Sequence, residues 1–208
     1  MSTTHTPKPT NDDILDIATH EFAEKGYDGA RMEEIAHAAQ VNKATLYYRI
    51  GDKDALFGAV LKRMFTTKLA HLDRTLDTID DVDEKLHAFA RVFVAGDHPT
   101  HFAAIMLREI AAGGRNLPDD VLPLMGRIVR TLECIVEQGV REGKFRDVNP
   151  FLTHMMLVGG LAFYATNKPI RERIAAQSPD TRSLTTEIPL DEAAAILADT
   201  LLHGVRKA

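Results

Sequence analysis

The chain has 208 residues, 45% of them apolar, which is enough to bury one large core or two modest ones. Its one cysteine, Cys134, excludes a disulfide framework or a zinc ribbon within the chain, and we expect this side chain to be buried. The net charge of −5, taken alone, argues against a nucleic-acid partner, and the lack of a membrane-length apolar run or a leader predicts a soluble, cytoplasmic protein with no membrane partner.

The N-terminal segment is predicted to begin with an arm and a first helix. Residues 1–10 are rich in threonine and proline and carry no helical periodicity, so we expect a disordered arm. Asn11 is a suitable N-cap for a helix over residues 12–25, and Gly26 is a suitable end. Helical spacing predicts its buried face, which consists of Ile14, Leu15, Ala18 and Phe22.

Two short helical patterns follow and meet at a tight turn. Residues 31–40 carry apolar side chains at i, i+3, i+4 and i+7, and Asn42 is a good N-cap for a second short helix over residues 43–50. Leu46 and Ile50 form the buried face of this second helix, which leaves its polar side chains exposed. Lysine, threonine and tyrosine side chains bond phosphate oxygens and base edges, and a helix this short suits a major groove. We therefore interpret the pair as a DNA-binding helix-turn-helix whose contacts come from Asn42, Lys43, Thr45, Tyr47 and Tyr48.

The distribution of charge supports this interpretation better than the net charge does. Residues 11–40 contain eight acidic and two basic side chains, whereas residues 41–68 contain six basic and two acidic ones. This segregation predicts a positive surface around the second short helix.

Residues 12–65 contain an ordered set of motifs: Ile14-x3-Ala18-x3-Phe22-x3-Gly26-Tyr27, Ile35-Ala36, Gln40-Val41-Asn42-Lys43, Thr45-Leu46-Tyr47-Tyr48 and Lys53-x2-Leu56-Phe57. With these motifs in this order, the segment resembles the DNA-binding domain of the TetR family of transcriptional regulators. The chain departs from the family pattern at Ala30, Arg31, Gln40, Ala44 and Ile50. The departure at position 30 removes a usual phosphate contact that Arg31 could supply, and Lys53, at the start of the next helix, could bond another phosphate. Gln40 stands where the family usually has glycine, so we expect a left-handed backbone there or an altered turn.

The remainder of the chain is predicted to be helical throughout. Expected helices cover residues 53–73, 82–95, 100–112, 118–142, 151–164 and 190–205, with one further helical turn at residues 170–175. Asn149 followed by Pro150 marks the start of the fifth of these, which is apolar almost all round and is therefore expected to be buried on most faces. The fold class is all-α with about nine helices. We expect a three-helix DNA-binding domain at residues 11–55 and a larger helical effector-binding and dimerisation domain at residues 56–208.

The resemblance implies a homodimer formed through the last two helices and an effector pocket among the middle helices. A charge in place of Leu157 or Leu201 is therefore expected to give monomers. The effector is expected to be a small apolar or amphipathic molecule, because the candidate lining side chains are mostly flexible or aromatic. These candidates are Phe89, Phe93, His101, Phe102, Ile105, Met106, Met155, Met156 and Phe163.

The resemblance thus implies a repressor that binds a palindromic double-stranded DNA operator as a homodimer and is released by a small-molecule effector. No cofactor or metal is expected, because His98, His101 and Glu109 match a metal-ligand spacing only loosely. Catalytic and phosphate-loop motifs are absent, so we do not expect an enzyme. The alternative is a helical ligand-binding or dimerisation protein whose head no longer reads a specific sequence, and the departures at Ala30, Gln40 and Ile50 favour it.

Overall fold

The computed structural model describes residues 8–96, 99–178 and 187–206, and within these ranges the chain forms ten α-helices and no strand. Their bounds are α1 Asn11–Gly29, α2 Met32–Ala38, α3 Lys43–Arg49, α4 Lys53–Leu76, α5 Val82–Val94, α6 Pro99–Ala111, α7 Leu122–Arg141, α8 Pro150–Thr166, α9 Lys168–Gln177 and α11 Leu190–Val205. The all-α prediction is confirmed. One helix more than the nine expected is present, because residues 168–177 form α9 and not a single turn. Most of the expected disordered arm lies outside the described residues.

The first three helices form a small head with its own apolar centre. Ile14, Phe22, Ile35 and Leu46 are almost completely buried there, as their helical spacing predicts, and they pack with Phe57 from the first turns of α4. Phe57 contacts Phe22 edge-on, with ring centroids 4.8 Å apart. The head is therefore closed by the helix that leaves it.

The ends of α1 differ from the sequence prediction. Thr10, and not Asn11, is the N-cap: its hydroxyl accepts a hydrogen bond from the Asp13 amide at 3.1 Å, and the Asp13 carboxylate accepts one from the Thr10 amide at 2.7 Å. This reciprocal pair gives hydrogen-bond acceptors to two backbone amides, those of Thr10 and Asp13, whereas a cap at Asn11 would give an acceptor to one. Gly26 does interrupt the helix, with φ of +70°, but a further helical turn continues to Gly29.

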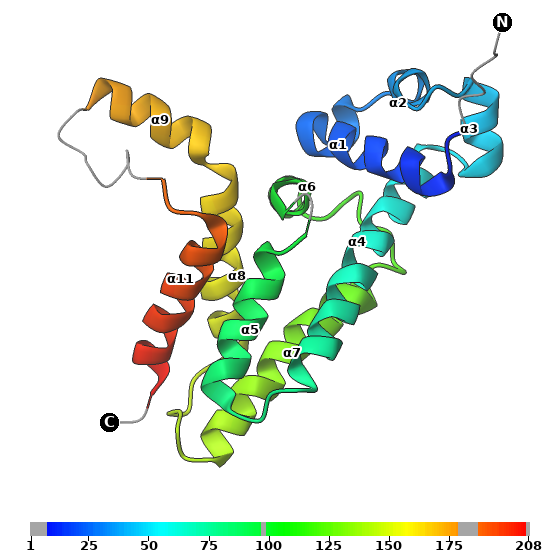
Figure 1. Cartoon of the computed structure of the whole chain (residues 1–208). Coiled ribbons are helices and arrows are strands. Elements are labelled where there is room, and N and C mark those ends of the chain that lie inside the picture. Colours follow the sequence, from blue (N-terminus) through cyan, green and yellow to red (C-terminus); the bar gives the residue numbers. More distant parts are fainter. Residues whose placement is uncertain (1–7, 97–98, 179–186, 207–208) are drawn as a thin grey trace, which may run out of the picture.

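The helix α4 connects the head to the rest of the molecule. It is a continuous helix of 24 residues that begins in the head and runs down along α5 and α7 (Figure 1). Its N-cap is Asp52, as expected, whose carboxylate accepts from the Ala55 amide at 2.9 Å. The expected domain boundary between residues 55 and 56 thus falls inside α4.

The helix α6 joins the head to the body at a second place, since it packs on α1 as well as on α8 (Figure 1). The guanidinium of Arg108 donates to the carbonyl of Glu24 at 2.9 Å, next to the break at Gly26. Beyond the end of α6, Arg115 pairs with Asp28 at 2.6 Å. The head is therefore held against the body through the C-terminal end of α1.

The last helices cover one side of the body. In Figure 1 α8 and α11 lie side by side against α5, and α9 projects away from the end of α8. The expectation that α8 is buried on most faces is wrong for the single chain, because one face packs on α6, α7 and α11 while the other is open. Four large apolar side chains of α8 that are at least half exposed stand on the open face, namely Phe151, Leu152, Met156 and Phe163.

The structure also corrects the expectation for Cys134. Cys134 is exposed, contrary to the prediction of a buried thiol, because it faces away from the buried stripe of α7 formed by Leu132, Ile135 and Val136. Among the described residues, no helix combines the length and the apolar character needed to cross a membrane.

Candidate functional site

The turn between α2 and α3 fixes the position of the short helix α3. Gln40 has φ of +54°, so a non-glycine residue does occupy the left-handed region, as the sequence suggested. The amide of Val41 donates a hydrogen bond to the carbonyl of Ala36 at 3.0 Å. The side-chain oxygen of Asn42 caps α3 by accepting a hydrogen bond from the Thr45 amide at 2.6 Å. Leu46 is completely buried and anchors the inner face of the helix.

The outer face of α3 presents the polar side chains expected to contact DNA. Tyr48 is 92% exposed and Tyr47 is 42% exposed, while Thr45 is half-buried beside them. Lys43 is exposed and forms an ion pair with Glu33 of α2, and this hydrogen bond raises the pKa of the Lys43 ammonium. Phenolic hydroxyls and an ammonium on one exposed face can reach both base edges and phosphates.

The other two expected contact residues belong to the neighbouring helices. Arg31 is exposed at the N-cap position of α2 and makes no side-chain capping bond. Lys53, at the start of α4, is half-buried: its ammonium lies over the ring of Tyr27, 4.7 Å from the centroid, and 3.3 Å from the carbonyl of Asp28. A phosphate contact from either side chain stays a prediction.

Within the described part of the chain, three of the six basic side chains of residues 41–68 are paired with acidic residues, namely Lys43, Lys62 and Arg63. Arg49 donates to the Asn11 side chain and the Pro9 carbonyl, which ties α3 to the start of α1. Arg63 pairs with Asp16 at 2.6 Å, and Lys62 pairs with Asp120 at 3.3 Å. Arg49, Lys62 and Arg63 therefore make contacts within the chain, and the polar face of α3 carries the candidate interface.

The candidate effector residues separate into two groups. Five of them are buried among α5 and α6, namely Phe89, Phe93, Phe102, Ile105 and Met106. Within this group, which we call the aromatic cluster, the rings of Phe89 and Phe93 are 5.1 Å apart and those of Phe93 and Phe102 are 6.4 Å apart. His101 instead stacks edge-on with His20 of α1, at 5.3 Å. The structure does not bring Met155, Met156 and Phe163 into the aromatic cluster, because they lie on the open face of α8.

Two polar residues next to the aromatic cluster were not among the expected site residues. His154 of α8 is buried against Phe89 and Phe93, burial lowers its pKa, and its Nδ1 forms no hydrogen bond with the described part of the chain. Lys68 of α4 is 8% exposed, with its ammonium 5.4 Å from the Phe93 centroid and 5.3 Å from that of Phe102. The sequence held a signal for Lys68, since it falls on the apolar stripe of α4 between Phe65 and Leu72.

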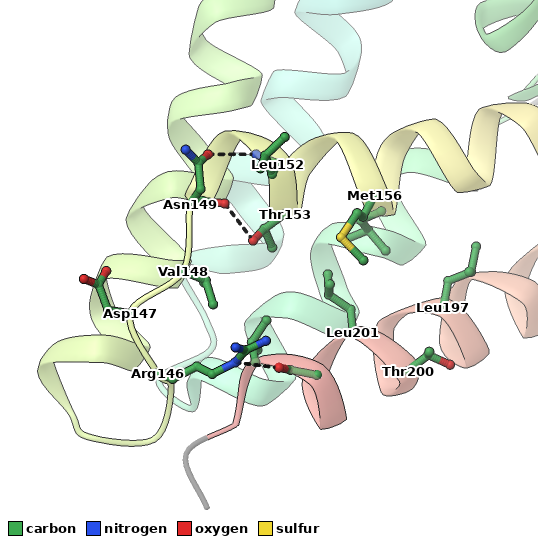
Figure 2. A pocket seen from close by; sticks show the side chains of 13 residues that line it. Arg146, Asp147, Val148, Asn149, Leu152, Thr153, Met156, Leu197, Thr200 and Leu201 are labelled. Carbon is green, nitrogen blue, oxygen red and sulfur yellow. Dashed lines mark hydrogen bonds between the residues drawn. The ribbon is translucent and has the colours of Figure 1, made fainter.

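The open face of α8 continues onto α11 and contains a groove of about 390 Å³ (Figure 2). Figure 2 shows Leu152 and Met156 of α8 on one side of this groove and Leu197 and Thr200 of α11 on the other, with residues 146–149 closing one end. The guanidinium of Arg146 donates to the carbonyl of Gly204 at 2.8 Å and so fixes that end to α11. An apolar groove flanked by exposed Met156, Phe163 and Ile196 is typical of a surface that another protein covers.

Leu157 and Leu201 are unsuitable for testing this surface. They are only 1% and 7% exposed, so their side chains are largely inside the single chain. A charge at either position would destabilise the fold itself, contrary to the expectation of intact monomers.

For the loosely matched metal pair of the sequence analysis, His98 lies outside the described residues.

Comparisons with known proteins agree with this geometry. Residues 14–60 match the family model described as bacterial regulatory proteins, tetR family, and this range covers most of α1, all of α2 and α3, and the first part of α4. The chain is 29% identical over 164 residues to the HTH-type transcriptional repressor NicS of Pseudomonas putida KT2440, which is 76% of this chain and 77% of that protein.

Solved structures share the fold along the whole chain. The regulator PfmR from Thermus thermophilus aligns over 100% of both chains with a TM-score of 0.71 and 22% identity. The transcriptional regulator FadR from Bacillus subtilis, solved in complex with stearoyl-CoA, aligns over 95% of this chain and 100% of its own with a TM-score of 0.69 and 18% identity. These two likenesses show that the arrangement of the helices is shared with solved regulator structures.

Proposed function

This chain belongs to the TetR family of transcriptional regulators, and on that premise we propose that it is a repressor that binds a palindromic DNA operator as a homodimer and is released by a small-molecule effector. The observation that carries the proposal is the exposed polar face of α3, held in place by the Asn42 cap and by buried Leu46. A repressor of chromosomal genes acts in the cytoplasm, which is the location that we propose for this protein.

In this proposal the residues of the head have distinct roles. Tyr47, Tyr48 and Thr45 read base edges or position the helix in the major groove. Lys43 contacts a phosphate, for which it exchanges its ion pair with Glu33, and such an exposed pair contributes little to stability. Arg31 and Lys53 bond phosphates on either side of the groove. The head at residues 11–55 is the reading domain, and residues 56–208 form the sensor and the dimer.

The dimer is proposed to form through α8 and α11. Support comes from the exposed apolar side chains of these helices, among them Met156, Phe163 and Ile196, and from the groove between the two helices. Self-association of this surface in a two-fold arrangement gives a four-helix interface. Two copies of α3 would then reach successive major grooves, about 34 Å apart, as a palindromic operator requires.

The effector is proposed to act at the aromatic cluster, because this part of the body packs against α4, which enters the head. A ligand with higher affinity for one orientation of α4 shifts the population of head positions, and that differential affinity sets how strongly it lowers operator binding.

The test is the fluorescence anisotropy of labelled DNA that flanks the protein's own gene, at two salt concentrations and with non-specific competitor. We expect binding that resists competitor and weakens steeply with salt. If no flanking sequence is preferred, a selection from random DNA decides between a distant operator and a head that no longer reads sequence. Failure of that selection would reject the proposal in favour of the second possibility.

A further inference from the structure

We propose that a groove between the head and the body binds a small monocarboxylate with an apolar body, and that the ammonium of Lys68 receives the carboxylate. Thr19 of α1, Arg63 and Lys68 of α4, Val92 of α5 and Phe102 of α6 are among the side chains that line this groove of about 440 Å³. Binding in the groove is independent of DNA, whereas its use as the effector site rests on the proposed function.

Lys68 has spare hydrogen-bonding capacity at the floor of this groove. Its ammonium donates to the carbonyls of Val92 at 3.1 Å and Phe93 at 2.8 Å, near the C-terminal end of α5. An ammonium has three N–H donors, so one remains after these two bonds. The partners are neutral carbonyls, and the positive charge of this buried group is therefore not balanced by a carboxylate. A charged donor of this kind binds an anionic oxygen more strongly than a neutral one.

The other charges around the groove favour one negative charge on the ligand and no more. The second cation, Arg63, is already paired with Asp16 at 2.6 Å and lies 3.7 Å from a carboxylate oxygen of Asp12. These two aspartates stand at the groove and would repel a dianion. The N-terminal end of α6 also opens onto the groove, since Pro99, its first residue, is among the lining residues. Its dipole adds to the attraction that Lys68 exerts on an anion.

The remaining walls of the groove suit an apolar body. Met64, Val92, Pro99 and Phe102 contribute hydrocarbon surface, and Lys68 lies over the ring of Phe102 at 5.3 Å. A flat ring or a short alkyl chain could lie against these side chains while its carboxylate reaches the ammonium. Benzoate and octanoate have this chemistry and serve as probes.

A molecule bound here would contact the head and the body at once. Asp12, Asp16 and Thr19 belong to α1, whereas Val92 and Phe102 belong to the body, and Lys68 is part of the helix that connects them. A ligand that bridges these elements favours one separation of α1 from the α5–α6 junction. The groove also shares Phe102 with the aromatic cluster, so a ligand here acts on the same part of the body.

The first experiment is isothermal titration calorimetry of the full-length protein, without DNA, against benzoate, octanoate and the neutral analogue benzamide. We expect at least one of the two carboxylates to bind with a Kd below about 1 mM, and benzamide to bind at least about tenfold more weakly. This comparison needs no variant. Equal affinity for benzamide, or no binding of either carboxylate at about 1 mM, would overturn the proposal.

The second experiment compares two methionine substitutions on the same helix. Lys68→Met should weaken carboxylate binding by at least about tenfold. Lys62→Met is the matched control, because Lys62 is exposed and paired with Asp120, and it should bind as the wild type does. Circular dichroism establishes that both variants are folded, and unchanged binding in a folded Lys68→Met protein contradicts the assignment.

The effector role is tested separately by adding the bound carboxylate to the protein–DNA complex. Release of the DNA by the wild type but not by Lys68→Met supports the effector role. Carboxylate binding without release leaves the groove as a ligand site and rejects that role. Carboxylate binding by a protein that recognises no DNA rejects the proposed function and not the groove.

Discussion

The exposed side chains of α3 offer the most direct test of the proposed DNA binding. We expect Lys43→Ala and Tyr47→Ala each to weaken operator binding severely while the dimer stays intact, because both side chains are exposed and lie in the head, outside α8 and α11. Loss of the Lys43 phosphate contact should also reduce the slope of log affinity against log salt by about 1. Anisotropy titrations at several salt concentrations measure both effects.

The control for these variants is Lys144→Ala. Lys144 is an exposed lysine that is likewise paired with an acidic residue, Asp81 at 2.7 Å, but it lies after α7, outside the head. The Lys144→Ala protein should bind the operator as the wild type does. If Lys43→Ala and Tyr47→Ala behave like this control, α3 is not the recognition helix.

Lys68 should give the protein a distinctive dependence of stability on pH. Burial lowers its pKa from 10.5 to about 8 in the folded chain. Between these values the unfolded chain holds the proton and the folded chain does not, so the free energy of unfolding rises with pH in that window. Relative to Lys68→Met, which does not titrate, the wild type should gain up to about 3 kcal/mol between pH 7 and pH 10.5.

Urea denaturation of both proteins across this range measures the difference. Asp12, Asp16, Arg63 and His71, which line the same groove, are present in both proteins, so their titration largely cancels. A difference that does not change with pH would mean that Lys68 keeps an ordinary pKa in the folded chain.

The sequence predicts the role of a residue well when its partners are close to it in the chain. The cap at Asn42 follows from neighbouring residues, and the left-handed backbone at Gln40 was one of the two possibilities that the resemblance left open. The roles of Arg49 and Arg63 could not be predicted, since their partners, such as Asn11 and Asp16, lie far away in the chain. Lys68 was missed for the same reason, because its carbonyl partners belong to α5.

At the scale of helices, the two glycines of α7 are expected to respond in opposite ways to alanine. A Cβ at Gly139 would overlap the ring of Phe145, which is almost completely buried, so Gly139→Ala should destabilise the fold by about 1–3 kcal/mol. Gly126 has no neighbouring atom within 4 Å of the added Cβ, and Gly126→Ala should stabilise the fold by about 0.5 kcal/mol through helix propensity.

Thermal and urea unfolding of the two variants provide the measurement. Each variant is the other's control, because the same substitution is made in the same helix and only the packing environment differs. Equal effects of the two substitutions would show that Phe145 is free to move away from α7.

Helix type and order were predictable, but exposure of whole faces was not. Apolar periodicity and caps located the helices within a few residues, and the late start of α7 at Leu122 reflects the turn at residues 119–121 that precedes it. Periodicity alone could not show which apolar side chains remain open in a single chain. For this reason the predicted effector residues included Met156 and Phe163. These two side chains are apolar like those of the aromatic cluster, but they are exposed and not part of it.

For the whole molecule, the open face of α8 and α11 predicts how the dimer can be disrupted. Met156→Glu and Phe163→Glu should give folded monomers, because these side chains are 66% and 64% exposed in the single chain and a carboxylate there would be buried at the interface. Light scattering measures the mass, and circular dichroism measures the fold. The monomers should also lose most of their affinity for a palindromic operator, since each offers a single recognition helix.

Ile110→Glu is the control for this experiment. Ile110 is a similarly exposed apolar residue, 63%, but it lies on α6 and not on the proposed interface. The Ile110→Glu protein should remain dimeric. Dimers that persist in both Met156→Glu and Phe163→Glu would place the interface on another surface.

The unbroken length of α4 has a mechanical consequence. A helix of 24 residues is about 36 Å long, and no glycine or proline interrupts it after Gly58, so its lower three-quarters can be treated as a stiff rod. A tilt of this rod by about 5° about its body end moves its other end by about 2 Å, which exceeds the tolerance of a hydrogen bond. In the proposed mechanism, a side-chain-sized displacement at the body end of α4 would therefore be enough to disturb the register between two recognition helices and one operator.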